Sequence, residues 1–95
     1  MEFKFPVYVL DKDSRDVYLY KSRKEMNALE GVDVEAELYE AWDCDGQILQ
    51  LIAKGVKRGR SFIGLGWVIV GSFDVLPTGR YIDQAQVREL ASRAE

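Results

Sequence analysis

The chain has 95 residues, 47% of them hydrophobic, a formal net charge of −3 and no histidine. This length and composition suit one globular domain and exclude a chain that is disordered throughout. The lack of histidine removes the commonest general base and metal ligand. A single cysteine, Cys44, cannot form a disulfide within the chain, and no apolar run approaches the roughly 20 residues of a membrane span. We therefore expect a cytoplasmic protein with no membrane partner.

Two strands are expected near the start of the chain. Residues 3–10 alternate apolar and other side chains with a period of two, which is typical of a strand and unlike a signal peptide. Because Pro6 has no amide hydrogen to donate, this strand either lies at a sheet edge or begins after the proline. Residues 12–16 form a polar turn, and the β-branched and aromatic residues 17–20 predict the returning strand.

A short helix is expected over residues 23–30. Ser22 and Glu25 have the spacing of a capping box, in which each side chain bonds to the backbone of the other. Gly31 then provides a left-handed terminator.

The most informative stretch is residues 34–53, which predict two strands joined by a turn at 43–46. Asp at the first and third turn positions and Gly at the fourth suit a type I turn closed by a left-handed glycine. This register places Trp42 opposite Ile48, while a tighter loop at 45–46 is the competing register. Apolar residues on both faces predict a central pair covered on both sides.

The second half of the chain gives weaker signals until its last helix. Residues 54–60 predict a basic loop that contains glycine, and the apolar residues 61–73 predict one long strand or two short ones. Residues 76–79 (Leu-Pro-Thr-Gly) indicate a turn. Asp83 and Gln86 form a second capping box, which predicts a C-terminal helix.

The expected order is strand, strand, helix, strand, strand, strand, helix. This order predicts a single α+β domain over residues 1–95, with an antiparallel sheet of about five strands and two helices.

The charges are unevenly distributed along the chain. Residues 25–53 contain eight acids and no base, and residues 54–60 contain four bases and no acid. An acidic hairpin surface of this kind predicts recognition of a basic protein partner, although solvated strand edges and turns would give the same pattern. The residues predicted to bind the partner are Glu35, Glu37, Glu40, Trp42, Asp43 and Asp45.

The basic loop carries the alternative function. The side chains of Lys54, Lys57, Arg58 and Arg60 could bind phosphate or nucleic acid, assisted by backbone amides near the loop glycines. The negative net charge and the lack of aromatic residues interleaved with these bases argue against it. Nucleic acid is therefore the second choice of partner, and the oligomeric state is left open.

Other chemistry-bearing patterns are incomplete. Gly64-Leu65-Gly66 lacks the third glycine of a dinucleotide-binding motif, and residues 43–46 lack the glutamate that completes a calcium loop. Cys44 lies between two carboxylates, which disfavour its thiolate. We expect no catalytic residue, no metal and no cofactor, and hence no enzyme.

Part of the first half resembles a set of small bacterial proteins. The matching pattern is LExxDVE…EYEAWDxxGxxL, carried here by residues 29–35, 37–43 and 46–49. The resemblance implies a shared fold more than an activity. Some small acidic bacterial proteins of this general kind are immunity proteins, so by analogy it implies a toxin-neutralising role for the acidic hairpin.

Overall fold

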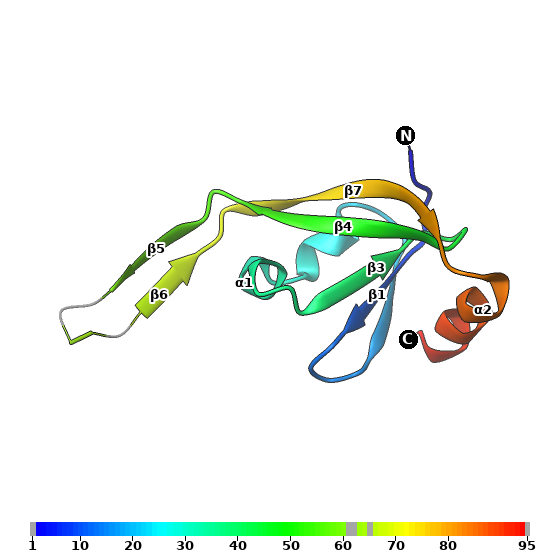
Figure 1. Cartoon of the computed structure of the whole chain (residues 1–95), viewed down its shortest axis with the longest axis horizontal. Coiled ribbons are helices and arrows are strands. Elements are labelled where there is room, and N and C mark those ends of the chain that lie inside the picture. Colours follow the sequence, from blue (N-terminus) through cyan, green and yellow to red (C-terminus); the bar gives the residue numbers. More distant parts are fainter. Residues whose placement is uncertain (1, 61–62, 65, 95) are drawn as a thin grey trace.

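The computed structural model describes residues 2–60, 63–64 and 66–94. Within these described residues, seven strands, two α-helices and one 3₁₀ helix (η1) follow one another along the chain (Figure 1). Their bounds are β1 Val7–Asp11, β2 Val17–Tyr20, η1 Glu25–Ala28, α1 Gly31–Glu35, β3 Tyr39–Trp42, β4 Gln47–Lys54, β5 Lys57–Arg60, β6 Gly66–Ile69, β7 Ser72–Tyr81 and α2 Gln84–Arg93.

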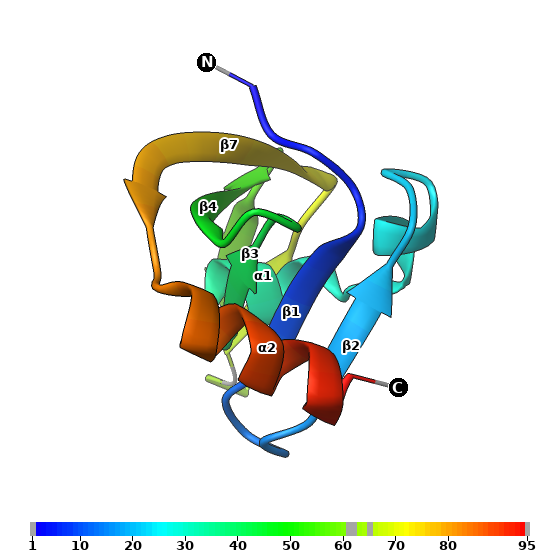
Figure 2. The ribbon, with the colours of Figure 1, turned by 90° about the vertical axis from the view of Figure 1, so that its right-hand side faces the viewer.

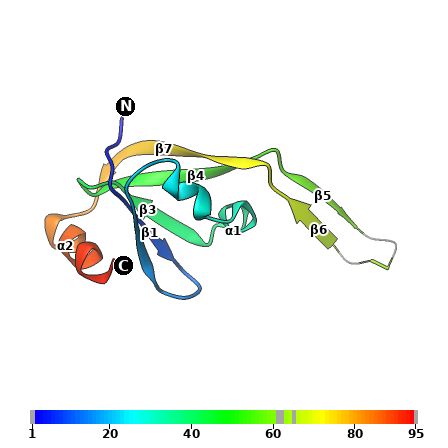
Figure 3. The same cartoon turned by 180° about the vertical axis from the view of Figure 1, so that it is seen from behind.

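Five of the strands form one antiparallel sheet in the order β2-β1-β3-β4-β7, and β5 pairs with β6 in a second sheet of two strands. The β5–β6 pair continues the β4–β7 ribbon and extends away from the remainder of the molecule (Figure 3). We call residues 55–71 the arm and the remaining residues the body. The architecture confirms the predicted small α+β fold.

One face of the five-stranded sheet carries the hydrophobic core. Alternate residues of β1 point to this face, and η1 and α1 supply the side chains that cover it. The buried residues of this core are Val7, Val9, Met26, Leu29, Val34, Ala41, Leu49 and Phe73. The core thus joins segments from both halves of the chain.

The opposite face is covered at one end by α2. Val17 is buried on that face and forms a parallel bridge with Ala94, while Leu90 is the buried residue of the helix. In Figure 2, α2 lies in front of β1 and β2, and α1 lies behind them. The sheet is therefore covered on both faces near β1, and less so toward β7.

The central hairpin has the predicted register. Trp42 lies opposite Ile48 and Ala41 lies opposite Leu49. Gly46 has φ +89°, and a side chain there would collide with Val87, so glycine is required both by the turn and by the close approach of α2. The C-terminal helix also agrees with its prediction, because both halves of the Asp83 capping box are present.

The predicted helix over residues 23–30 is wrong in extent. Only η1 forms, and the chain becomes extended at Leu29, where ψ is 137°. Ser22 Oγ accepts from the Glu25 amide at 3.2 Å, but Glu25 reaches back to the Lys21 amide, not to that of Ser22. Leaving the helix early lets both Met26 and Leu29 become buried in the core.

Gly31 begins a helix where the sequence predicted an end. It is the first residue of α1, and a Cβ built on it would lie 2.9 Å from Cγ1 of Val70. The glycine therefore permits a close approach between α1 and the base of the arm. Because α1 occupies residues that were assigned to a strand from Val34 onward, that strand begins only at Tyr39.

The turn predicted at residues 76–79 is also wrong, because these residues lie inside β7. Thr78 donates its hydroxyl hydrogen to the Ile48 carbonyl at 2.6 Å, and the register shifts between Gln47 and Leu49. Pro77 is tolerated because β7 is an edge strand of the sheet, where an amide hydrogen need not be donated.

The segment predicted as a basic loop contributes to two strands. Lys54 ends β4, Gly55 has φ +63°, and residues 57–60 form β5. The segment 61–73 contains β6 and the first residues of β7, so the described part is divided near Gly71 rather than forming one strand. Residues 61, 62 and 65 of the predicted strand lie outside the described residues.

Candidate functional site

The turn of the central hairpin is built around a buried carboxylate. Asp43 is 1% exposed, and its Oδ1 accepts from the amides of Asp45 at 2.9 Å and Gln47 at 2.8 Å. Its Oδ2 accepts from the Lys4 amide at 3.3 Å. These bonds satisfy the turn internally, so the structure corrects the assignment of Asp43 to a partner-binding surface.

Gln47 extends this polar cluster to two further segments. Its side chain donates to the Glu2 carbonyl at 2.9 Å and accepts from the Gly79 amide at 3.0 Å. Both polar atoms of a side chain that is 1% exposed are thereby satisfied. Asp43 and Gln47 together tie the N-terminal segment and β7 to the hairpin.

The other acids predicted to bind a partner are dispersed, and most lie beside a base. Asp45 is 3.7 Å from Lys4, and Glu40 is 3.9 Å from Lys12. Glu35 forms an ion pair with Arg58 across the gap between α1 and the arm. Glu37 is exposed, and no ion pair involves it among the described residues. The hairpin is therefore not a continuous acidic ribbon.

Cys44 follows Asp43 in the turn. Desolvation by burial, with the neighbouring Asp45 and Asp43 carboxylates, raises the pKa of the Cys44 thiol above its usual value. A raised pKa keeps the thiol protonated, and a protonated thiol is a poor nucleophile.

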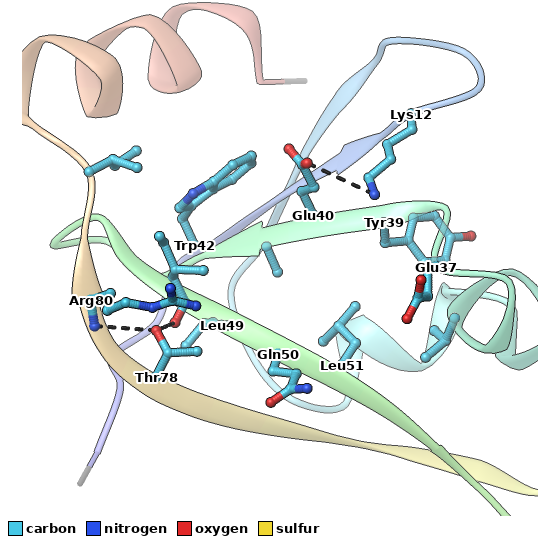
Figure 4. A pocket seen from close by; sticks show the side chains of 14 residues that line it. Lys12, Glu37, Tyr39, Glu40, Trp42, Leu49, Gln50, Leu51, Thr78 and Arg80 are labelled. Carbon is cyan, nitrogen blue, oxygen red and sulfur yellow. Dashed lines mark hydrogen bonds and ion pairs between the residues drawn. The ribbon is translucent and has the colours of Figure 1, made fainter.

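A cleft opens where β3 separates from β4. The two strands pair only at Ala41–Leu49 and Trp42–Ile48, after which β4 continues beside β7 and β3 beside β1. The opening holds a cavity of about 580 Å³, a volume within the range of binding pockets. Figure 4 shows Glu40 and Trp42 on the β3 side, and Gln50, Thr78 and Arg80 on the other.

The floor of the cleft is apolar and its rim is charged. The buried or half-buried residues Val34, Leu49 and Leu51 line the floor, while the exposed residues Lys12, Glu37, Glu40 and Arg80 lie around the opening. Two acids and two bases at the rim make the entrance polar without a strong charge of either sign. The arrangement suits a large side chain that has both an apolar body and a polar or aromatic edge.

A second hollow of about 670 Å³ adjoins the cleft and leads toward the arm. It shares Val34, Glu37, Gln50 and Leu51 with the first, and it ends at Val56 and Arg58. The two hollows follow the side of β4 from which β3 has departed. This edge of β4 has no strand neighbour among the described residues beyond Leu49.

Tyr39 closes one end of the cleft. Burial first, and then the Asp33 and Asp11 charges, raise the pKa of Tyr39 to about 12. Its hydroxyl donates to Asp33 Oδ2 at 3.3 Å. The phenol thus remains protonated and holds α1 against the start of β3.

The arm exposes large apolar side chains. Trp67 is 47% exposed and Ile69 is 57% exposed. The indole of Trp67 lies directly over Gly59, because a Cβ built on that glycine would be 2.3 Å from the ring. A pair of four-residue strands is marginally stable alone in water. The arm therefore presents an apolar and aromatic surface with little core beneath it.

The four bases predicted as an anion site are separated by the fold. Lys54 lies in β4 and pairs with Asp74 at 2.6 Å, and Arg58 pairs with Glu35. Lys57 and Arg60 are exposed on β5. Trp67 lies opposite Gly59, so Lys57 shares the face of the ring, whereas Arg58 and Arg60 point to the other face of the strand pair.

The sequence did not reveal the cleft or the arm. The arm left a detectable signal, because residues 57–60 and 66–69 are two short segments bounded by glycines and joined by five residues. Such spacing is compatible with a β-hairpin. The cleft has no local signal in the sequence, because it forms where β3 pairs with β1 and β4 pairs with β7.

Comparison with known proteins gives no relative: no family model, no curated protein and no solved structure matches the chain. Within the described residues, no group of three or more His, Cys, Asp or Glu side chains is placed to hold a metal ion. Neither of the described helices has the length and apolar content needed to cross a bilayer.

Proposed function

We propose that this chain is a non-catalytic protein-interaction domain that contacts its partner through the arm and the cleft beside it. The observation that carries the proposal is the arm, which leaves about half of the Trp67 and Ile69 surface in water. Aromatic residues exposed together with arginine are characteristic of interface anchors.

The division of charge supports the same function. The arm contains three of the 13 bases and none of the 16 acids, so the body contains ten bases and 16 acids and carries −6. Opposite charges on two parts of one molecule favour oriented encounters with a partner. The acidic partner surface predicted for the hairpin is thus better placed on the body as a whole.

A non-catalytic role agrees with the chemistry of the side chains. The chain lacks histidine, and its one thiol has a raised pKa. The unpaired cysteine also favours a reducing, cytoplasmic location.

The test is affinity capture from an extract of the source cells, with the purified chain as bait. The arm variant combines Trp67→Ala, Ile69→Ala and Arg60→Glu, and the control combines Tyr81→Ala, Leu76→Ala and Lys24→Glu on exposed parts of the body. A partner recovered by the wild type and the control should be lost from the arm variant. Equal recovery by all three baits would refute the proposal.

A narrower form of this proposal is a bacterial immunity-type role, in which the partner is a basic toxin. Glu37 and Asp45 remain exposed for such a contact. The double variant Glu37→Lys, Asp45→Lys should then lose the toxin while it keeps its fold. Capture that persists after both charges are reversed would exclude this form.

Nucleic acid is the second candidate partner, favoured by an exposed Trp67 on the same strand pair as Lys57, Arg58 and Arg60, with Lys57 on the face of the ring. Stacking of a base on an exposed ring, together with phosphate contacts, is the common mode of single-strand binding. Binding to a fluorescent oligonucleotide should weaken steeply between 50 and about 200 mM salt if this mode is used. An absence of binding at low salt would exclude it.

A further inference from the structure

The arm cannot use the cleft of its own chain. It leaves the body beyond Gly55 and points away from β1, β3 and α2, and the Glu35–Arg58 ion pair joins its base to α1 (Figure 1). The longest dimension of the molecule is 51 Å, along the direction in which the arm extends. An exposed aromatic surface and an open apolar-floored cleft therefore coexist in one chain without meeting.

We infer that the arm of one protomer occupies the cleft of a second copy, so that two chains form a reciprocal dimer. This inference rests on the proposed interaction function and names its partner. In a twofold arrangement each chain gives one arm and receives one, which closes the assembly at two copies.

The net charges of the arm and the body favour a second copy as the occupant. The arm carries +3 and the body −6, so an arm placed on another body brings opposite charges together. Contact between two arms would instead place two groups of three bases side by side. Electrostatics therefore favour arm on body over arm on arm.

The cleft fits Trp67, an exposed aromatic residue in the described part of the arm. Its volume of about 580 Å³ and its floor of Val34, Leu49 and Leu51 can receive the indole of Trp67. The rim bases Lys12 and Arg80 are suitable partners for the face of an indole. The rim acid Glu37, which has no ion pair among the described residues, is available to Lys57, which lies on the same face of the strand pair as Trp67.

The dimer also gives the β4 edge a neighbour. Beyond Leu49, this edge lies open beside the two hollows. A stable interface buries on the order of 1,200–2,000 Å² in total, and two identical arm–cleft contacts would each supply half of that area.

The test is the molar mass of the purified full chain by sedimentation equilibrium, between about 1 and 200 μM. The monomer has a mass of 10.9 kDa, and we expect twice this value at the upper concentrations. Raising the salt from about 20 to 500 mM should shift the equilibrium toward monomer. A monomer throughout the range would overturn the inference, and so would a dimer that salt strengthens, because salt relieves repulsion between arms.

Variants locate the contact. Trp67→Ala should weaken dimerisation at least tenfold, and the exposed control Tyr81→Ala should leave it unchanged; equal effects would place the interface elsewhere. Lys57→Glu with Arg60→Glu should likewise give monomers, whereas Lys21→Glu with Lys24→Glu should not. Unfolding curves that match the wild type at 1 μM establish that each variant is folded.

Charge exchange gives the decisive result. The cleft variant Glu37→Lys, Glu40→Lys and the arm variant Lys57→Glu, Arg60→Glu should each be monomeric alone. Mixed together, they should form a 1:1 dimer, because both arm–cleft contacts then join opposite charges. Failure of the mixture to dimerise would overturn the inference. If the chain is monomeric yet arm-dependent capture of another protein persists, the proposed function stands and only the self-association falls.

Discussion

The body and the arm are both antiparallel β-structure, yet they are stabilised differently. In the body, each of the strands β1, β3 and β4 has neighbours on both sides, and Val7, Val9 and Met26 are fully buried. In the arm, two strands have only each other, and half of the Trp67 surface remains in water. The comparison shows that strand pairing alone does not make a core, since the apolar area removed from water provides most of the stability.

The largest effect should come from emptying the body's core. Met26→Ala removes a fully buried side chain and should lower the free energy of unfolding by about 2–5 kcal/mol. Ile69→Ala on the arm should change it by less than about 0.5 kcal/mol. Urea unfolding at low protein concentration measures both, and comparable losses would remove the distinction between body and arm.

The buried carboxylate of the turn should come next. Asp43→Ala leaves the amides of Asp45 and Gln47 without their acceptor, at a cost of about 1–3 kcal/mol. Asp13→Ala, which removes an exposed acid of another turn, is the matched control. Equal midpoints of urea unfolding for the two variants would contradict the structural role assigned to Asp43.

A smaller effect is expected from crowding the arm. In Gly59→Ala, the new methyl group would meet the Trp67 ring and displace it, because the present separation would be 2.3 Å. Amide hydrogen exchange should accelerate in β5 and β6 but not in β1 or β3, with global stability changed by about 1 kcal/mol or less. Uniform acceleration across the sheet would show that arm and body unfold together.

The smallest effect should appear only at high pH. The pKa of Tyr39 is raised to about 12, so the folded state holds the phenolic proton more tightly than the unfolded state does. The contribution of the Tyr39 phenol to the free energy of unfolding is fully present below pH 10 and is lost as the pH rises toward 12. Tyr39→Phe should reduce this alkaline loss, and Tyr81→Phe should not. If the free energy of unfolding depends on pH identically in the two variants, the raised pKa of Tyr39 is contradicted.

Local rules predicted the elements whose determinants lie within a few residues. The hairpin register followed from Asp43 and Gly46, and the C-terminal helix followed from Asp83 and Gln86. Each of these signals acts over three or four positions. The fold class could be predicted because the order of such elements restricts the arrangement of layers.

The errors arose where distant contacts outweighed local preference. Gly31 was predicted to end a helix but begins one, because Val70, almost 40 residues away, packs against it. The Leu-Pro-Thr-Gly segment was predicted as a turn, yet Thr78 bonds to Ile48 and extends a strand through it. The acids of the candidate site were grouped by their positions in the sequence, and the fold disperses them for the same reason.

The close approach of Gly55 and Gly71 at the base of the arm makes the length of the arm independent of the structure of the body. A Cβ built at Gly55 would lie only 3.5 Å from the Cα of Gly71, so the two segments that enter and leave the arm come close together at this point. Lengthening or shortening the segment between these glycines would alter the reach of the arm without changing any residue of the hydrophobic core cluster. Variants of this protein could thus acquire a new binding specificity by replacement of the single continuous segment 55–71.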